Sequence, residues 1–385
     1  MKLETMQKIY RITTIPLSLE KLLGSQLTFI NQFYKITAVA AEPQELKRVA
    51  EKLKVSYEHV EMTRKITPLQ DLKALIQLYK LLKRDQPQIV HTHTPKAGIV
   101  GMLAARLANI PVRMHTVAGL PLMEARGLKR KILNIVEKLT YSCATNIYPN
   151  SKGLADFIIT EKLTDPKKLK IIANGSSNGI DTTYFSPLTQ KREILDELKL
   201  KLNITQDDFV FIFVGRLVGD KGINELVEAF IALERTNIKL LLVGPLETDL
   251  DPLQPKTLEK IQHPNIIQVG YQQDVRPYLA ISNALVFPSY REGFPNVVMQ
   301  AGAMGLPSIV SNINGCNEII VHHKNGIVIP VKNRNAIRKA MNSLIDHPEL
   351  YQQLQKYSRE MICERYEQHI VWNALLDEYN TLTNN

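Results

Sequence analysis

The sequence has little cysteine, few aromatic residues and no long apolar run. Its three cysteines, Cys143, Cys316 and Cys363, are odd in number and form no CxxC pair, which excludes a disulfide framework and the usual zinc spacings. No apolar stretch reaches the roughly 18 residues needed to span a bilayer, and the first residues lack the apolar core of a signal peptide. We therefore expect a cytoplasmic protein.

Charge is unevenly distributed along the 385 residues, although the net charge is +10. Residues 1–185 hold 28 Lys and Arg against 15 Asp and Glu, whereas residues 186–385 hold 20 against 23. A basic half suggests an anionic partner, and the alternative is a solvated lysine-rich surface. Helix-turn-helix, RNP and zinc patterns are missing and the basic residues are not interleaved with aromatic ones, so we expect no nucleic acid partner.

Short apolar segments alternate with amphipathic ones in both halves of the chain. KIYRITTIP, QIVHTHT, LKIIANG, FVFIFVGR and NALVFPS are typical of strands, and PLQDLKALIQLYKLLKRDQ and INELVEAFIALERT are typical of helices. This alternation predicts an α/β fold with two Rossmann-like doubly wound domains, which we expect to face each other across a cleft. The expected divisions are a first domain at 1–185, a linker at 186–206, a second domain at 207–355 and a C-terminal helix at 356–385 that packs back on the first domain.

One strand-end loop combines glycine with two cations. In FVGRLVGDKGINELVEAF, Gly215 lies in the turn, and Arg216 and Lys221 stand beside the free amide groups of a helix N-terminus. Helix-end amides and fixed cations both favour a diphosphate. The segment is therefore a candidate anion site, and the alternative is a basic turn without function.

A second strand-end loop, in FPSYREGFPNVVMQ, carries an acidic residue. The Glu292 carboxylate can accept hydrogen bonds from hydroxyl groups, and the amide groups of Gly293, Phe294 and Asn296 can donate to oxygens. Pro295 suits the first turn of the following helix. The alternative is that Glu292 only caps its own helix.

The segment QIVHTHTPKAG supplies candidates in the first half. We expect the side chains of His91 and His93 to take alternate faces of the strand, so that at most one points toward the cleft. Lys96 begins the following helix and is a candidate contact for phosphate or acceptor. For each histidine, a structural role is the alternative.

Two motifs together carry a resemblance to a known family. VGRLVGDKG, followed about 75 residues later by FPSYREGFPNVVMQAGAMGLPSIVSNINGCNEII, resembles the donor-binding half of retaining family 4 glycosyltransferases of the GT-B fold. RITTIPLSLEKLLGSQLTFI, HTHTPKAG and NGSSNGIDTTYF are similar to segments of bacterial enzymes that build surface polysaccharides, and the resemblance covers nearly the whole chain. It implies that residues 1–185 bind an acceptor and residues 207–355 a nucleotide-sugar donor.

The resemblance implies roles for the second-half residues. Arg216 and Lys221 match the pair that neutralises the donor diphosphate, and Glu292 matches the residue that holds hydroxyls of the transferred sugar. Glu318, in GCNEII, matches an acidic position after the next strand, and the alternative is a helix-start carboxylate. Gln300 stands where relatives commonly have a ribose-binding glutamate, and its carbonyl can still accept a hydrogen bond.

In the first half the resemblance points to three turns. Thr116 to Gly119 stand where many relatives have Thr-x-His-Gly, with Ala118 in place of the histidine. Gly24, in SLEKLLGSQ, matches the first-domain loop, and Asn178 matches the Asn-Gly-Ile-Asp turn before the interdomain crossing. For Gly24 and Asn178 the alternative is a purely structural turn.

Asp249, Leu250 and Asp251 spell DxD, the metal-diphosphate signature of the other large glycosyltransferase fold. Short acidic pairs arise often by chance, and Arg216 and Lys221 already supply positive charge for a departing diphosphate. We therefore expect no metal ion and no cofactor.

The resemblance implies a retaining glycosyltransferase that moves a hexose or N-acetylhexosamine from a nucleotide diphosphate sugar, expected to be UDP-linked, to a lipid-linked saccharide in O-antigen or capsule synthesis. The sequence offers no pair of carboxylates for double displacement, which favours front-face displacement. The alternative is a UDP-sugar epimerase of the same fold.

The segment GLKRKILNIVEKLTYS fits a membrane surface. It places Lys129, Arg130 and Lys131, with Arg126 immediately before the segment, beside apolar residues at helical spacing, a pattern that suits an anionic leaflet. We therefore expect peripheral association with the inner face of the cell membrane.

Overall fold

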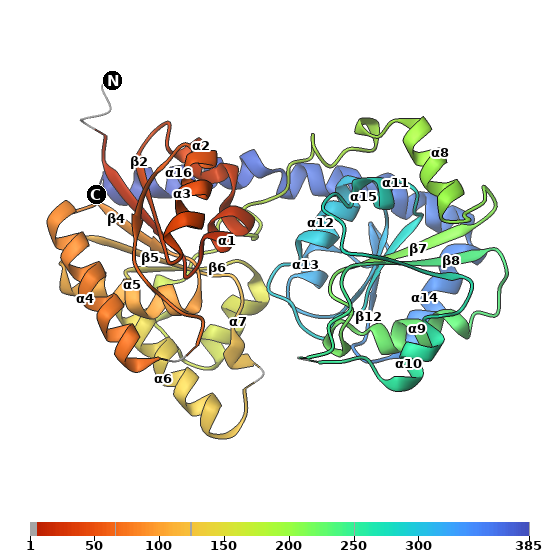
Figure 1. The fold of residues 1–385 in the computed structure, drawn as a ribbon, viewed down its shortest axis with the longest axis horizontal. Helices are drawn as coiled ribbons and strands as arrows, with labels where there is room; N and C mark the ends of the chain where they lie inside the picture. Colours follow the sequence, from red (N-terminus) through yellow and green to blue (C-terminus); the bar gives the residue numbers. More distant parts are fainter. Residues whose placement is uncertain (1–5, 66, 124, 250, 385) are drawn as a thin grey trace. The chain divides into compact units, whose positions relative to one another are not determined.

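The computed structural model describes residues 6–65, 67–123, 125–249 and 251–384. The chain divides into two compact units, each with one six-stranded parallel sheet and flanking helices (Figure 1). Unit 1 runs to Gly179 and takes up the chain again at Gln368, and unit 2 comprises Ile180–Glu367. The α/β fold with two doubly wound sheets, predicted from the sequence, is confirmed.

Unit 1 is built on a sheet whose strand order reverses next to its first strand. In sheet order the strands are β3 (Ser56–His59), β2 (Lys35–Ala40), β1 (Lys8–Ile12), β4 (Ile89–Thr92), β5 (Val112–Val117) and β6 (Asn146–Pro149). The helices are α1 (Pro16–Ser18), η2 (Leu19–Leu23), α2 (Ser25–Ile30), α3 (Pro43–Leu53), α4 (Pro68–Asp85), α5 (Pro95–Leu107), η3 (Pro121–Met123), α6 (Gly127–Cys143), α7 (Lys152–Thr160), η4 (Pro166–Lys168) and α16 (Gln368–Thr383).

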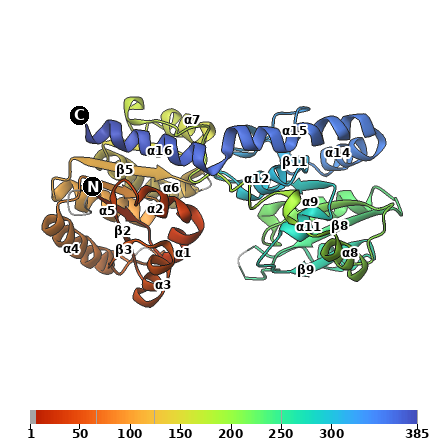
Figure 2. The same cartoon turned by 90° about the horizontal axis from the view of Figure 1, so that it is seen from above.

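The two faces of this sheet carry separate apolar layers. Tyr10 and Ile12 of β1 pack with residues of α4, α5 and α6, whereas Ile9 packs with residues of α2, α3 and α16. Alternate residues of a strand point to opposite faces, so Arg11 lies on the face of Ile9. This is the face along which α16 runs (Figures 1 and 2).

The segment LKIIANG, predicted as a seventh strand, is not a strand. Leu169 forms a single isolated bridge with Ile147 of β6, and the Lys170 amide donates to the Ile147 carbonyl at 3.0 Å. The backbone then turns at Ala173, whose φ is +49°. The prediction was wrong because an apolar, β-branched composition does not supply the continued ladder of hydrogen bonds that defines a strand.

Unit 2 repeats the same strand order. In sheet order its strands are β12 (Gly326–Ile329), β11 (Ser308–Ser311), β10 (Ala284–Phe287), β7 (Phe209–Val214), β8 (Ile238–Val243) and β9 (Ile266–Gly270). Its helices are η5 (Pro187–Thr189), α8 (Arg192–Lys201), η6 (Gly219–Lys221), α9 (Ile223–Ile231), α10 (Pro255–Lys260), α11 (Arg276–Ala280), α12 (Asn296–Ala303), α13 (Cys316–Ile319), α14 (Arg334–Asp346) and α15 (Pro348–Tyr366).

The boundaries between the two units differ from the expected ones at residues 185 and 356. Helix α15 packs on α12 and α14 and so belongs to unit 2, whereas α16 packs on α2 of unit 1. The expected linker contains α8, which contacts α11 of unit 2. The two crossing points are adjacent, because the Ile180 amide donates to the Tyr366 carbonyl at 2.8 Å. Among the described residues, no helix is long and apolar enough to cross a membrane.

Helix α6 buries a carboxyl group against the sheet side of unit 1. Glu137 is only 6% exposed, and burial raises its pKa from 4.5 to about 7. Below pH 4.5 the carboxyl is protonated in both the folded and unfolded states. Between the two pKa values only the unfolded state ionises, so the free energy of unfolding falls as the pH rises through this window.

We predict that Glu137→Gln stabilises unit 1 at pH 8 by up to about 3 kcal/mol, because a neutral amide removes the cost of the buried charge. At pH 4 the effect should be much smaller. Urea unfolding at both pH values measures the difference, with exposed Glu51→Gln as the control. An equal effect of Glu137→Gln at the two pH values would contradict the assignment.

Candidate functional site

The residues of unit 2 that were predicted to bind the nucleotide-sugar donor all follow three neighbouring strands. The loops after β7, β10 and β11 carry them, and β10 lies between β7 and β11 in the sheet. The carboxyl ends of parallel strands meet at one sheet edge, and the reversal of strand order between β7 and β10 opens a crevice there. Gly222 permits the close approach of the first two loops, since a Cβ on it would lie 2.2 Å from the Pro288 carbonyl oxygen.

Lys221 and Glu292 form an ion pair between these two loops. The ammonium donates to the carboxylate, and each side chain is only 16% exposed. The ammonium also lies 5.7 Å from the centroid of the Phe287 ring. The Asn314 side chain fixes the second loop by donating to the carbonyl oxygens of Glu292, at 3.0 Å, and Gly293, at 2.6 Å. The cation of Lys221 therefore lies beside a carboxylate, of Glu292, that can accept hydrogen bonds from hydroxyl groups.

Arg216 lies at the start of the same loop as Lys221 but has a different partner. It follows Gly215 at the end of β7, and its guanidinium lies 2.8 Å from the Glu247 carboxylate. Its side chain is 45% exposed, so the guanidinium can leave Glu247 at little cost. Arg291 is similarly exposed and donates to Asp220 at 2.7 and 2.9 Å.

The remaining residues that were predicted to bind the sugar donor lie at the start of α12 and on the neighbouring helix α13. Phe294 is buried and its ring meets Tyr366, with centroids 5.4 Å apart, while Pro295 is the N-cap of α12. Asn296 begins the helix and Gln300 follows one turn later. Glu318 lies on α13, and its carbonyl oxygen accepts from Arg365 and Tyr366; helix α13 contacts α12. A Cβ on Gly315, which precedes α13, would lie 2.5 Å from the Gly293 carbonyl oxygen, so α13 begins against this loop.

The DxD segment has a structural use. The Asp251 carboxylate accepts from the Asp220 amide at 2.5 Å, and its carbonyl accepts from the Gly219 amide at 3.0 Å. Asp251 therefore caps η6, the turn that presents Lys221. Asp249 is exposed, and Leu250 lies outside the described residues.

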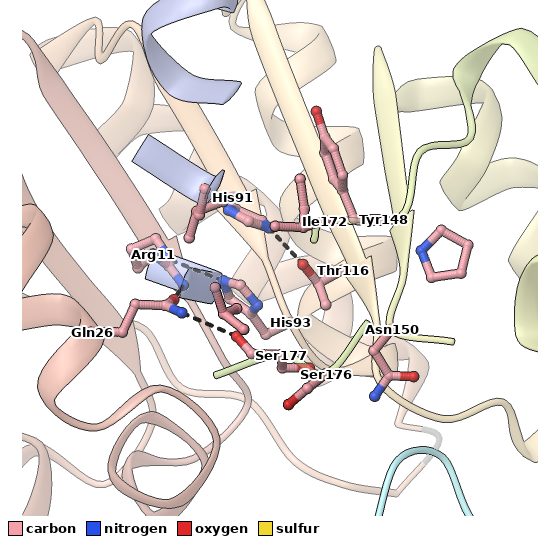
Figure 3. A pocket seen from close by; sticks show the side chains of 13 residues that line it. Arg11, Gln26, His91, His93, Thr116, Tyr148, Asn150, Ile172, Ser176 and Ser177 are labelled. Carbon is pink, nitrogen blue, oxygen red and sulfur yellow. Dashed lines mark hydrogen bonds between the residues drawn. The ribbon is translucent and has the colours of Figure 1, made fainter. Parts of the chain in front are cut away.

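Unit 1 has a polar pocket at the corresponding reversal of strand order, between β1 and β4 (Figure 3). Side chains from four adjacent strands or strand ends line it, together with α2, α16 and the loop at 172–177. The polar side chains among them are Arg11, Gln26, His91, His93, Thr116, Tyr148, Asn150, Ser176 and Ser177. Nearer the start of β4 and β5, Ile89, Val112 and Met114 are buried on the same face of the sheet. The pocket therefore extends the apolar layer beneath α16, but it is lined with polar residues.

Hydrogen bonds connect most of the pocket. Arg11 donates from Nε to His93 Nε2 at 2.9 Å and from Nη2 to Gln26 Oε1 at 2.8 Å, and Gln26 Nε2 donates to the Ser177 carbonyl at 3.0 Å. His91 bonds with Thr116 and with Tyr379 of α16, each at 2.7 Å. Burial lowers the pKa of both His91 and His93 well below its ordinary value.

The expectation that His91 and His93 take alternate faces was wrong. Both line the pocket, and their ring centroids are 4.1 Å apart. The reason is the two-residue period of a strand, which puts residues i and i+2 on the same face. Thr92 takes the opposite face and bonds with His115 at 2.7 Å.

The other first-half candidates do not line the pocket. Lys96 is ion-paired with Asp71 of α4. Asn178 accepts from Trp372 of α16 through its carbonyl, at 3.1 Å, and its side chain, at 2.7 Å. Gly24 has a φ of +47° between η2 and α2, and a Cβ on Gly119 would meet no described atom within 4 Å. Of the predicted first-half residues, His91, His93 and Thr116 therefore line the pocket.

Sequence reasoning missed Arg11, Gln26, Asn150 and Ser177 in unit 1. A signal was present for the first of these, because Arg11 interrupts the otherwise apolar strand KIYRI and is completely buried. A charged residue in the middle of a buried strand is rare unless it is paired or functional.

Two family profiles match the chain. The one described as "Glycosyl transferases group 1" covers residues 196–361, and the one described as "Glycosyl transferase 4-like domain" covers residues 30–175. Each profile falls mainly in one unit.

Named relatives match over most of the chain. The capsular polysaccharide biosynthesis glycosyltransferase CapM of Staphylococcus aureus is 33% identical over 97% of both chains. An Escherichia coli enzyme, UDP-Gal:alpha-D-GlcNAc-diphosphoundecaprenol alpha-1,3-galactosyltransferase, is 32% identical over 74% of this chain and 72% of its own. Among solved structures, Anabaena HepE in complex with UDP superposes with a TM-score of 0.78 at 16% identity, over 98% of this chain and 100% of its own.

We predict that Asp251→Ala lowers the free energy of unfolding of unit 2 by about 1–2 kcal/mol, the usual effect of losing a side-chain cap. Asp249→Ala, the matched control at an exposed position, should have no effect. Addition of Mn²⁺ should leave the unfolding temperatures of wild type and both variants unchanged. A Mn²⁺-dependent rise that is lost in Asp251→Ala would instead make the DxD segment a metal site.

Proposed function

This chain belongs to the family 4 glycosyltransferases of the GT-B fold, and on that basis we propose the reaction that it catalyses. It transfers a hexosyl or N-acetylhexosaminyl group from a nucleotide diphosphate sugar, UDP-linked, to a lipid-linked saccharide during the synthesis of a cell-surface polysaccharide. The anomeric configuration of the sugar is retained. No metal ion or cofactor takes part.

The names of the relatives support the substrate classes. One relative is named for capsular polysaccharide biosynthesis, and another for a UDP-sugar donor with a diphosphoundecaprenol-linked acceptor. Both are more than 30% identical to this chain. The GT-B neighbour with bound UDP supports the fold alone.

The observation that carries the proposal is the Lys221–Glu292 pair at the strand-order reversal of unit 2. The Lys221 ammonium and the Arg216 guanidinium attract the diphosphate, together with the amide groups at the start of α9. The Glu292 carboxylate accepts hydrogen bonds from the sugar hydroxyls. The amide groups of Gly293, Phe294 and Asn296 donate to sugar oxygens, and the side chain of Gln300 accepts from the nucleotide ribose.

Charge stabilisation drives the reaction in this proposal. As the bond between the anomeric carbon and the phosphate oxygen breaks, negative charge grows on the diphosphate beside Lys221 and Arg216. The acceptor oxygen bonds to the anomeric carbon on the same face. Its proton passes to the departing phosphate oxygen, which balances the step without a protein base.

The rival function is a UDP-sugar epimerase, which would alter the donor without an acceptor. Incubation with a UDP-sugar alone separates the two, because an epimerase yields a new UDP-sugar whereas a transferase needs an acceptor to consume the donor. The 33% identity to a named glycosyltransferase over 97% of the chain favours transfer.

We predict that Lys221→Ala lowers kcat/KM by about 100-fold or more, because a fixed cation no longer meets the charge of the leaving group. Glu292→Gln should weaken binding of the UDP-sugar while leaving the affinity for UDP nearly unchanged, since the carboxylate contacts the sugar. Steady-state kinetics and calorimetric titration with UDP and the UDP-sugar measure both effects.

The matched control is Arg235→Ala, which also breaks an ion pair of unit 2. Arg235 follows the C-terminal end of α9 and pairs with Asp346 at 2.6 Å. This end of the helix lies away from the strand-end loops, so turnover should be unchanged. Full activity of both Lys221→Ala and Glu292→Gln would refute the assignment of the site.

We also propose that unit 1 binds an anionic membrane surface, where a lipid-linked acceptor resides. Helix α6 exposes four apolar side chains at a helical spacing, and Leu128 and Ile135 among them are 73% and 67% exposed. Ile132 and Leu139 complete this stripe. Lys129, Lys131 and Lys138 are exposed on the same helix. Apolar and cationic residues on one exposed helix favour an anionic leaflet.

We predict that the full chain floats with vesicles that contain anionic lipid and much less with zwitterionic vesicles. The double variant Leu128→Ser/Ile135→Ser should lower the floated fraction several-fold, because less apolar surface enters the leaflet. Leu188→Ser is the control, since Leu188 is 94% exposed on unit 2. Flotation that is independent of anionic lipid, or equal for both variants, would overturn the proposal.

A further inference from the structure

The pocket of unit 1 holds a buried positive charge, on Arg11, that no carboxylate of the described residues pairs. Arg11 is 0% exposed, and among the described residues its guanidinium forms no ion pair. Its polar partners, His93, Gln26 and Tyr379, are neutral groups, because burial lowers the pKa of His93 and raises that of Tyr379. A charge in such an environment is strongly unfavourable unless a counter-charge is bound. The Glu378 carboxylate, which accepts from Tyr148 of the pocket wall, is already paired with Lys170.

Four polar atoms of the pocket have no hydrogen-bond partner among the described residues. They are Arg11 Nη1, His93 Nδ1, Asn150 Oδ1 and Ser177 Oγ. Arg11, His93 and Asn150 are each at least nine-tenths buried, with exposures of 0%, 4% and 6%. Buried polar groups are normally satisfied, and all four residues line the same pocket. Figure 3 shows Arg11, His93 and Ser177 around one space.

The hydrogen-bonding character of these atoms defines the ligand. Arg11 Nη1 can only donate, and His93 Nδ1 carries a hydrogen, because Nε2 of the neutral ring accepts from Arg11. The Ser177 hydroxyl can donate as well. The Asn150 carbonyl oxygen, whose amide nitrogen donates to the Ala118 carbonyl at 3.3 Å, needs a donor. The fitting ligand is therefore an oxyanion that also carries one hydroxyl group.

We propose that this pocket binds a hydrogen phosphate group, either the free ion or the singly protonated terminal group of a phosphomonoester. Arg11, His93 and Ser177 donate to its oxygens, and its hydroxyl donates to Asn150. The cavity volume of about 20 Å³ is too small for a sugar ring or a base. The site lies wholly within unit 1 and goes beyond the transfer reaction.

The test is thermal unfolding of the full chain with phosphate or sulfate at equal ionic strength. Because the loops of unit 2 also attract phosphate, the titration uses the Lys221→Ala variant as its background. Phosphate should raise the unfolding temperature by about 2 °C or more at saturation. Sulfate, which has no hydroxyl at neutral pH, should raise it less. Equal responses to the two ions, or no response to phosphate, would overturn the proposal.

Ser177 offers a matched pair of substitutions in a half-buried loop position. Ser177→Asp places a carboxylate near Arg11, so it should raise the unfolding temperature without phosphate and abolish the response to phosphate. Ser177→Ala removes only one hydroxyl and should keep most of the response. A full phosphate response in Ser177→Asp would show that phosphate binds elsewhere and would refute the assignment.

Two further probes keep the proposal testable and identify the source of the phosphate group. Calorimetric titration of the Lys221→Ala protein with phosphate measures binding directly, in case Ser177→Asp does not fold. Glycerol 3-phosphate supplies a phosphomonoester. Tighter binding of glycerol 3-phosphate than of phosphate assigns the site to phosphomonoesters, whereas the opposite order assigns it to the free ion. Binding of neither overturns the proposal.

Discussion

The reversal of strand order is the constraint on which the candidate sites of both units depend. Between β7 and β10 it brings two strand-end loops close enough for Lys221 and Glu292 to pair, and Gly222 allows the backbones to approach. Between β1 and β4 it leaves the space that Arg11 and His93 line. The same topology thus produces a partly buried ion pair in one unit and a buried cation in the other.

Much of the fold and of the unit 2 site could be predicted from the sequence. Short apolar segments predict strands well where the strand lies between two neighbouring strands of a buried parallel sheet, as β7 and β10 do. The loops that carry glycine and charged residues follow directly after these strands in the sequence, so Lys221 and Glu292 could be named as candidates. Their direct pairing could not be predicted, because it depends on the close approach of two loops that lie 71 residues apart.

The pocket of unit 1 could be predicted only in part, because its residues come from strands and loops far apart in the chain. Arg11 and His93 are 82 residues apart, and Gln26 and Ser177 are 151 apart. His93 was found through a local motif, whereas Arg11 acquires meaning only from its burial on the α16 face. Asp251 shows the opposite case, since it belongs to a local DxD motif that we did not expect to bind metal, and its contacts make it a cap for η6.

The position of α16 determines when unit 1 can finish folding during synthesis of the chain. Unit 2 is continuous in sequence, whereas the sheet of unit 1 is covered on one face by the last helix, through contacts such as Tyr379 with His91 and Trp372 with Asn178. The ribosome therefore delivers the whole of unit 2 before unit 1 can close. A chain truncated before Gln368 would leave exposed the apolar residues of β1, β4 and β5 that α16 covers.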